Sequence, residues 1–252
     1  DSISANRSAN WAGEWDGDDT YNAQPYGQWT VANATFIGGG STANSSNGNI
    51  IIRANGAAKV FNSIFTGFKR DRALVIEDNL DEAVQDSRKR LESGDIVFRN
   101  NLFWDCGGAT VADSVYRWYI PSTRVYTAAP GLRDSMAAWN NGYVDPMLGK
   151  ISYSQASMLV PQPRQGSPAY TDISTLPTNS FLTAVNYKGA FGTTADANWA
   201  DGWSFLSGGN YFGDFQNISS VRGRIADKPG VISLKSVTTG KNLTVAYSLP
   251  RA

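Results

Sequence analysis

The sequence predicts an all-β fold: a parallel β-helix (solenoid) with a short inserted helix and a small β-sandwich-like appendage at its C-terminal end. One rung of similar sequence occurs three times, at residues 31–38, 60–67 and 97–105. Each rung has Asn, two residues, Phe, one residue and then Gly or Asp, and the asparagines follow one another after 29 and 38 positions. A repeat of this length is typical of stacked architectures. β-branched runs beside turn residues, such as residues 49–53, favour strands.

The Phe and the Asn of each rung predict two columns of side chains. Equivalent residues of successive coils lie above one another in a parallel solenoid. The expected inner column consists of Phe36, Phe65 and Phe103. The expected amide ladder, which would satisfy main-chain groups along a turn, consists of Asn33, Asn62 and Asn100. The alternative is three unrelated turn asparagines, because Asn is common in turns.

The composition fits one sizeable core with a small appendage, and it argues against several functions. The 252 residues carry 22 basic and 22 acidic side chains, and this zero net charge argues against a general nucleic-acid-binding surface. The absence of histidine excludes Ser-His-Asp chemistry and the usual zinc ligands. The single cysteine, Cys106, excludes an internal disulfide and is expected to be a buried small hydrophobe. No segment has the roughly 18 apolar residues of a transmembrane helix.

Two domains are expected. Residues 1–215 would hold the C-terminal coils of the solenoid with irregular, aromatic-rich loops. Residues 216–252 would hold the start of a β-sandwich-like sorting or linker domain, where alternating runs on either side of Gly240 predict a hairpin. Within the first domain, residues 80–92 are charged and have helical spacing. They predict a helix with Asn79 as N-cap and Gly94 as stop.

Two stretches carry a family resemblance: residues 48–76, and the Gly- and aromatic-rich residues 186–203. They resemble large secreted bacterial surface proteins that are right-handed parallel β-helices ending in a type IX secretion sorting domain. The resemblance covers residues 29 to 205 or so, and the tail from Ile232 to Pro250 is similar to the start of the sorting region. It implies right-handed coiling, export across the outer membrane and a cell-surface location. It carries over no catalytic residue, and the chain departs from a complete member at both ends.

Aromatic and acidic residues are the candidates for ligand and metal binding. An indole can stack on a sugar ring, and the candidates are Trp15, Trp29, Trp118 and Trp139; the alternative is packing in the core or caps. The only dense acidic group consists of Glu14, Asp16, Asp18 and Asp19. Its spacing does not match an EF-hand loop, which leaves open a structural calcium site, catalytic carboxylates or a solvated acidic loop.

The favoured hypothesis is a non-enzymatic extracellular or cell-surface β-solenoid: a spacer, an adhesin or a component of a surface assembly. Solenoid ends expose strand edges, so other surface proteins or further segments of the same polypeptide are expected to cap the end before residue 29. The only cofactor considered is structural calcium. The alternative is a carbohydrate-active β-helix that binds polysaccharide or cleaves it by β-elimination. Its positive groups would be Arg53, Lys59, Lys69, Arg70 and Arg72.

Overall fold

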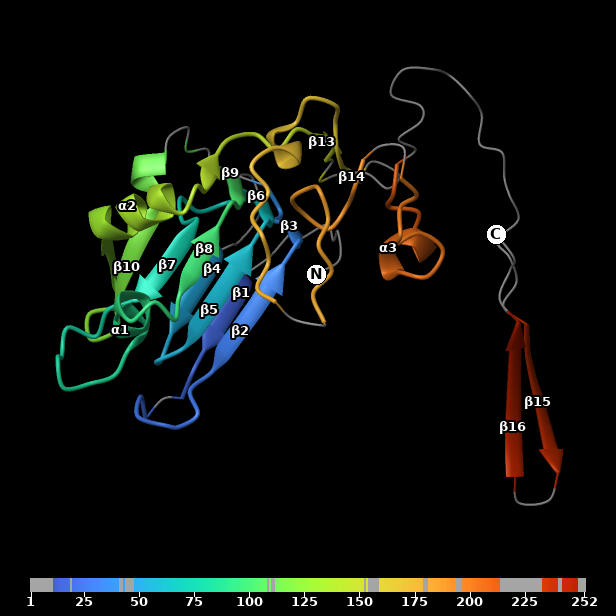
Figure 1. Cartoon of the computed structure of the whole chain (residues 1–252), viewed down its shortest axis with the longest axis horizontal. Helices are drawn as coiled ribbons and strands as arrows, with labels where there is room; N and C mark the ends of the chain where they lie inside the picture. The colour runs from blue at the N-terminus through green and yellow to red at the C-terminus, as the bar shows by residue number, and fades with distance from the viewer. Residues whose placement is uncertain are drawn as a thin grey trace.

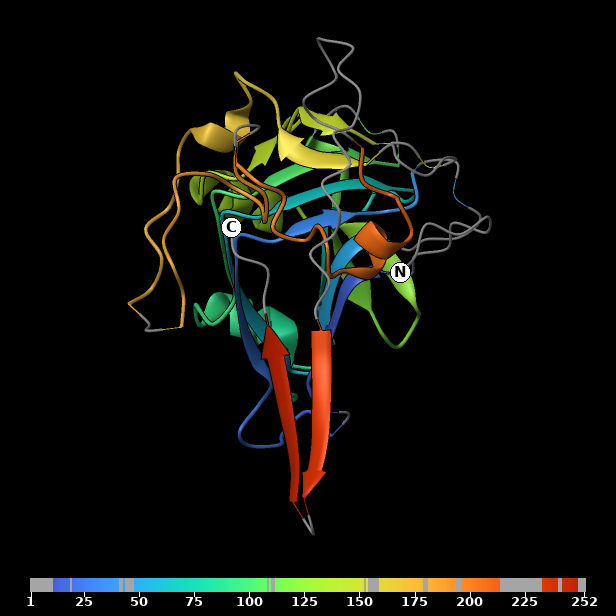
Figure 2. The same ribbon diagram turned by 90° about the vertical axis from the view of Figure 1, so that its right-hand side faces the viewer.

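The computed structural model describes residues 11–18, 20–40, 43, 48–107, 109, 112–151, 153, 159–178, 181–193, 196–213, 233–239 and 242–248. This part of the chain is rich in strands, has few helices and pairs most strands in parallel, which confirms the all-β class. The strands run side by side in layers, and the short helices lie at the margins of the layers (Figures 1 and 2).

Three sheets contain most of the strands, and the chain enters them in the same order in three successive passes. The first sheet contains, in spatial order, β1 (Trp11–Asp16), β4 (Gly48–Arg53), β7 (Leu74–Glu77), β10 (Tyr116–Ile120) and β11 (Val125–Ala128). The second contains β2 (Gln28–Ala32), β5 (Ala57–Phe61) and β8 (Val97–Arg99). The third contains β3 (Thr35–Ile37), β6 (Ile64–Phe68), β9 (Leu102–Cys106) and β12 (Gly142–Tyr143). Only β11 pairs antiparallel in these sheets.

A sharp turn joins the second sheet to the third in each pass. Asn33, Asn62 and Asn100 sit in this turn, with φ of 52°, 48° and 56°. Asn visits this left-handed conformation more readily than most residues with a Cβ, because its short polar side chain bonds locally. The Asn of the rung therefore recurs because the same backbone turn recurs.

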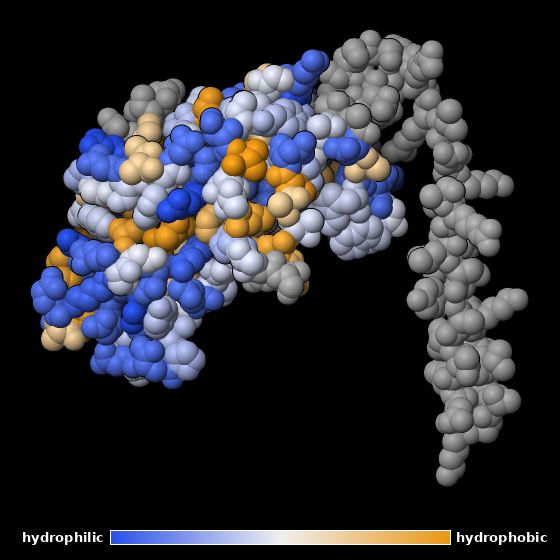
Figure 3. All heavy atoms as spheres, in the orientation of Figure 1, coloured by the Kyte–Doolittle hydropathy of each residue, from blue (hydrophilic) through white to orange (hydrophobic). Residues whose placement is uncertain are grey.

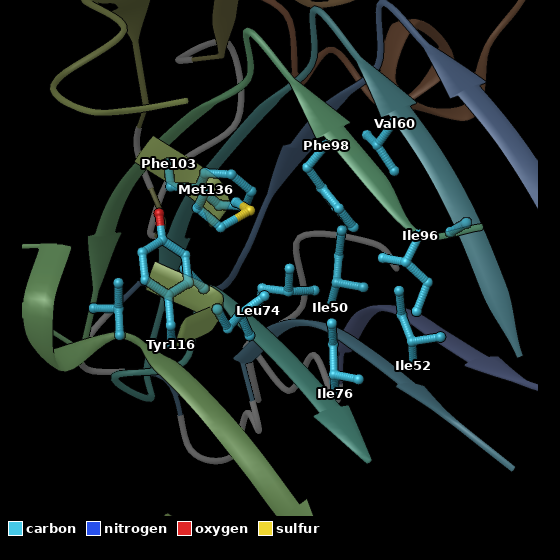
Figure 4. Packing of buried hydrophobic residues seen from close by; sticks show 14 of the residues in the cluster. Ile50, Ile52, Val60, Leu74, Ile76, Ile96, Phe98, Phe103, Tyr116 and Met136 are labelled. Atoms are coloured by element: carbon cyan, nitrogen blue, oxygen red, sulfur yellow. The ribbon is translucent and has the colours of Figure 1, made fainter. Parts of the chain in front are cut away.

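Ile64, Leu102, Leu148 and Ala169 form a small apolar cluster, and most other buried apolar side chains of the described residues form one large core. Figure 4 shows its centre, where aliphatic side chains of the first sheet approach side chains of the second; the labelled ones include Ile50, Ile52, Leu74, Ile76, Val60 and Phe98. The rings of Phe36, Phe65 and Phe103 stack beside them with centroids 4.9 Å apart in both steps. Phe65 and Phe103 are fully buried, whereas Phe36 is only partly buried. Each fully buried ring contributes about 1.5–3 kcal/mol from its removal from water.

The amide ladder lies one position later than expected. The Asn62 side chain donates to the Ser174 carbonyl (2.9 Å) and accepts from the Ser174 amide (2.8 Å), so it holds a distant loop instead of its neighbours in the stack. The next residue of the turn makes the ladder. Asn101 Oδ1 accepts from the Ser63 amide (2.8 Å), and Asn101 Nδ2 donates to Asn141 Oδ1 (2.9 Å). This position points into the stack, where it can reach buried main-chain groups of the neighbouring passes of the chain.

The inserted helix is shorter than expected. α1 (Ser87–Glu92) occupies only the last part of residues 80–92, and its N-cap is Asp86, not Asn79. One Asp86 carboxylate oxygen accepts from the Lys89 amide (2.9 Å) and the other from the Asn79 amide (2.7 Å). The cap therefore also holds the preceding turn, and the helix begins directly after it. Hydrophilic side chains cover this end of the molecule (Figure 3).

The stack formed by the three sheets ends differently on its two sides. After β10 the chain turns back as β11 and forms α2 (Pro130–Ala138), which buries Leu132 and Met136 in the core. β12 then adds two residues to the third sheet. Beyond it lie the antiparallel pair β13 (Leu148–Lys150) and β14 (Val160–Pro163), the 3-10 turn η2 (Pro168–Tyr170) and α3 (Phe205–Gly208). A second 3-10 turn, η1 (Ala112–Ser114), precedes β10.

The C-terminal hairpin is confirmed. β15 (Ser233–Thr239) pairs antiparallel with β16 (Asn242–Ser248) over their whole length. Of the expected β-sandwich-like appendage, the described residues contain this two-stranded sheet. The expected boundary between residues 215 and 216 lies outside the described residues.

Candidate functional site

A cleft of about 820 Å³ lies where the first pass of the sheets meets a later part of the chain. One wall comes from β1 and from β3 with its following turn. The other comes from residues 151–161 and 190–212. Among the described residues its lining is mostly apolar and contains no Asp, Glu, Lys or Arg: Trp11, Ala12, Asn33, Ala34, Thr35, Phe36, Ile37, Gly38, Gly39, Phe68, Ile151, Tyr153, Leu159, Pro161, Ala190, Phe191, Trp199, Ala200, Trp203, Ser204, Leu206 and Phe212.

The first wall is the open end of the stack. β1, β2 and β3 are each the last strand of their sheet, so each has a partner on one side only within the described structure. One face of the Phe36 ring stacks on Phe65, and Phe36 also lines the cleft. The end of the apolar core is therefore accessible at this point, beside an unpaired strand edge.

The second wall is a row of aromatic rings. Phe191 stacks on Trp199 with ring centroids 5.6 Å apart, and Trp199 meets Trp203 at 5.7 Å. Both tryptophans are exposed, at 55% and 69% of their surface. Their indole N–H groups already donate to the Ala190 and Trp199 carbonyls at 2.7 and 2.6 Å. The row therefore offers ring faces, not hydrogen-bond donors.

Short-range hydrogen bonds fix this row against the stack. Ser204 caps α3 by accepting from the Ser207 amide, and Gly202 makes the preceding turn at φ 81°. The Ala190 amide donates to Thr35 Oγ1 (2.8 Å), and Asn33 Nδ2 donates to the Tyr187 carbonyl (2.6 Å). Main-chain groups of the protein thus engage Thr35 Oγ1, Ser204 Oγ and Asn33 Nδ2, whereas Asn33 Oδ1 is buried without a hydrogen-bond partner.

The tryptophans predicted as ligand-binding residues do not gather in one place. Trp15 and Trp29 stack on each other with centroids 6.3 Å apart, and both are partly buried. Trp118 and Trp139 pack partly buried against the core, and Trp118 also faces the Arg88 guanidinium at 5.4 Å. The exposed row at Phe191, Trp199 and Trp203 was missed. Its signal in the sequence is the concentration of aromatic residues with Gly between residues 187 and 212.

The acidic group does not converge on a metal site in the described residues. Arg53 bonds both Asp16 carboxylate oxygens (2.7 and 2.9 Å) and Glu14 Oε1 (2.5 Å). Asp18 instead accepts hydrogen bonds from the Thr20 hydroxyl and from the Thr20 amide (2.8 Å). These two hydrogen bonds lower the Asp18 pKa. Asp19 lies outside the described residues. Within that limit, no three Asp, Glu, Cys or His side chains are close enough to hold a metal ion.

Three of the basic residues considered for β-elimination are engaged by other groups of the protein. Arg53 is bound by Glu14 and Asp16, as above. The Arg72 guanidinium lies 3.6 Å from the centre of the Tyr126 ring, and burial lowers its pKa. Lys69 Nζ donates to the Ala43 carbonyl. None of the five lines the cleft.

Cys106 and Glu77 are ionisable groups buried away from the cleft. Burial raises the pKa of the Cys106 thiol to about 12 and also raises the pKa of the Glu77 carboxyl. The thiol accepts from Asn49 Nδ2 at 3.2 Å, and Glu77 Oε2 accepts from the Ala54 amide at 2.7 Å. A thiol with so high a pKa is a poor nucleophile at neutral pH.

Comparisons of this chain with protein-family models, with curated proteins and with solved structures give no match. Among the described residues, no helix has both the length and the apolar character that crossing a membrane requires.

Proposed function

We propose that this chain forms coils of a right-handed parallel β-helix that acts as a structural part of an extracellular or cell-surface protein. The observation that carries the proposal is the register of the sheets. Phe36 lies opposite Phe65 and Phe65 opposite Phe103, while the first and second sheets repeat in the same order. Successive coils in register over one continuous core make a stiff rod, which suits a spacer, an adhesin or a component of a surface assembly.

The resemblance of residues 29–205 to secreted surface β-helices supports the location. On this proposal the protein is bacterial, reaches the outer surface by type IX secretion, and continues through residues 216–252 into a sorting region. Its partners are other surface proteins or further segments of the same polypeptide that cover the open end of the stack.

The exposed indole faces of Trp199 and Trp203 favour one second candidate, the binding of a polysaccharide. Aromatic faces offer a sugar ring an apolar surface on which its C–H groups can lie. This candidate requires no catalytic group.

One incubation experiment separates these functions. The purified chain is mixed with a panel of neutral and anionic polysaccharides, once with Ca²⁺ and once with a chelator. The retention of the chain by each polysaccharide and the absorbance of unsaturated uronides are both recorded. A structural role predicts neither signal. Retention without cleavage would move the assignment to polysaccharide binding, and cleavage of any member would overturn the non-enzymatic proposal.

A further inference from the structure

We infer that the cleft receives an extended peptide segment that pairs with the free edge of β3 and places an aromatic side chain on Phe36. This inference rests on the proposed structural function and specifies the partner of its open end. The cleft combines three features in one place: a strand edge without a partner among the described residues, the end of a ring stack, and a wall of exposed indoles.

The main chain of β3 has one edge available. Gly38 donates to the Thr66 carbonyl (2.9 Å), and Ala34 accepts from the Ile64 amide (2.8 Å), so these residues face β6. Main-chain groups alternate in direction along a strand. Those of Thr35 and Ile37 therefore face the opposite edge, where an added strand can bond them, as in peptide recognition by strand addition.

The ring stack gives the added segment its register. From Phe103 to Phe65 to Phe36, the rings step by 4.9 Å with planes 9° and 6° apart. The spacing matches the distance between neighbouring strands of a sheet. A strand paired in parallel with β3 would place its residue opposite Phe36 one further step along, on the ring face that lines the cleft. An aromatic residue there would extend the stack.

The polar chemistry of the cleft favours a peptide over a sugar. A sugar site needs several side chains free to bond hydroxyl groups. Here Asn33 Nδ2 donates to the Tyr187 carbonyl, Thr35 Oγ1 accepts from the Ala190 amide, and the Ser204 hydroxyl caps α3. Asn33 Oδ1, which is buried without a hydrogen-bond partner, is one acceptor that a main-chain N–H of the peptide can use. A peptide needs few such side chains, because its own main chain pairs with the strand. The apolar side chains that predominate in the described part of the lining further favour an apolar segment.

A peptide carrying the rung sequence is the probe. Residues 60–68 of this chain share the rung with β3, so a synthetic peptide of that sequence imitates one more rung. We expect saturable binding to the full chain, seen as a change in tryptophan fluorescence. Replacing the phenylalanine of the peptide that corresponds to Phe65 with alanine should weaken binding about ten-fold, as expected for losing one stacked aromatic contact. A scrambled peptide should not bind.

The matched protein variants are Ile37→Pro and Thr30→Pro. Proline removes an N–H without disturbing the paired side when the residue faces the free edge. Ile37 faces the free edge of β3, and by the same alternation Thr30 faces the free edge of β2, away from the cleft. Ile37→Pro should weaken peptide binding at least about ten-fold, which corresponds to losing edge hydrogen bonds. Thr30→Pro should leave binding unchanged. Circular dichroism checks that both variants fold.

Several results would overturn the inference. One is failure of the folded wild-type chain to bind the rung peptide, and another is equal binding of the alanine and original peptides. The peptide comparison needs no protein variant, so it decides the matter even if Ile37→Pro does not fold. A fluorescence change with cellohexaose but not with peptide would assign the cleft to a sugar. A dimer lost in Ile37→Pro would assign the edge to a second copy. Polysaccharide cleavage would contradict the proposed function, but it would not change the interpretation of the peptide-binding result.

Discussion

The two ends of the sheet stack are covered in different ways. At one end β11 reverses direction beside β10, and α2 places Leu132 and Met136 over the core. At the other end β1, β2 and β3 are all last strands, and the partly buried Phe36 lines a cleft. The difference teaches that the repeat itself does not decide where the stack stops. An irregular segment has to stop it: α2 packs directly on the core at one end, whereas the segment with Trp199 and Trp203 faces the other end across the cleft.

The largest expected difference between the ends concerns the ring stack. Phe65→Ala, in the closed interior, should lower the free energy of unfolding by about 3–5 kcal/mol, because a cavity would remain between two rings. Phe36→Ala, at the open end, should cost clearly less, because water already reaches its site. Urea unfolding followed by circular dichroism measures both. Equal losses would mean that the open end is as well covered as the interior.

The amide ladder gives the next largest effect. Asn101→Ala removes the partner of the buried Ser63 amide and should cost about 1–3 kcal/mol. Asn33→Gly is the matched change at the open end, since it keeps the left-handed turn and loses one bond to the Tyr187 carbonyl. Its cost should be smaller. Thermal unfolding of the two variants side by side checks the order, and the reverse order would contradict the position of the ladder.

Glu77 should make the interior sensitive to pH. Burial raises its folded pKa above that of the unfolded chain, so the folded state holds the proton more tightly. The stability that this proton contributes is complete below the unfolded pKa and is lost as pH rises through the folded pKa, by about 1.4 kcal/mol for each unit of difference. Glu77→Gln should remove this fall. The measurement is the free energy of unfolding against pH, from acid to neutral, for both proteins; parallel curves would contradict it.

The smallest effect is expected at the edge of the first sheet. Arg53 links β4 to Glu14 and Asp16 of β1, but all three side chains are roughly one-third exposed. Arg53→Met should therefore cost no more than about 1 kcal/mol, and the difference should shrink at high salt. Unfolding at low and high ionic strength tests this. A large loss that salt does not change would show that the open edge depends on this cluster.

The rungs could be predicted because their cause is local. A turn that needs a left-handed residue selects Asn, and a strand that points one ring inward selects Phe, so Asn62 and Phe65 recur as a pattern in the next coil. The same locality explains the hairpin on either side of Gly240. The ladder residue Asn101 was misplaced by one position, because the sequence shows which residues turn but not which side chain points into the stack.

The cleft could not be predicted, because its walls meet only in the folded chain. Trp199 comes from a segment without repeat or alternation. This segment is attached to β3 by single hydrogen bonds, such as that from the Ala190 amide to Thr35 Oγ1. Similarly, Asn141 completes the ladder although it follows α2 and belongs to no rung. Trp15 and Trp29, which were predicted to bind a ligand, stack on each other. Composition identified aromatic residues, but not which of their faces remain exposed.

The single thiol of the chain can report on transient opening of the stack. Cys106 lies at the end of β9, fully buried, and its pKa of about 12 keeps it protonated at neutral pH. An alkylating reagent can therefore reach and modify it only while the strands around β9 are transiently open. The rate of labelling under native conditions would measure how often these strands open. Repeating the measurement with a partner bound at the far edge would show whether covering one end stabilises strands that the partner never touches.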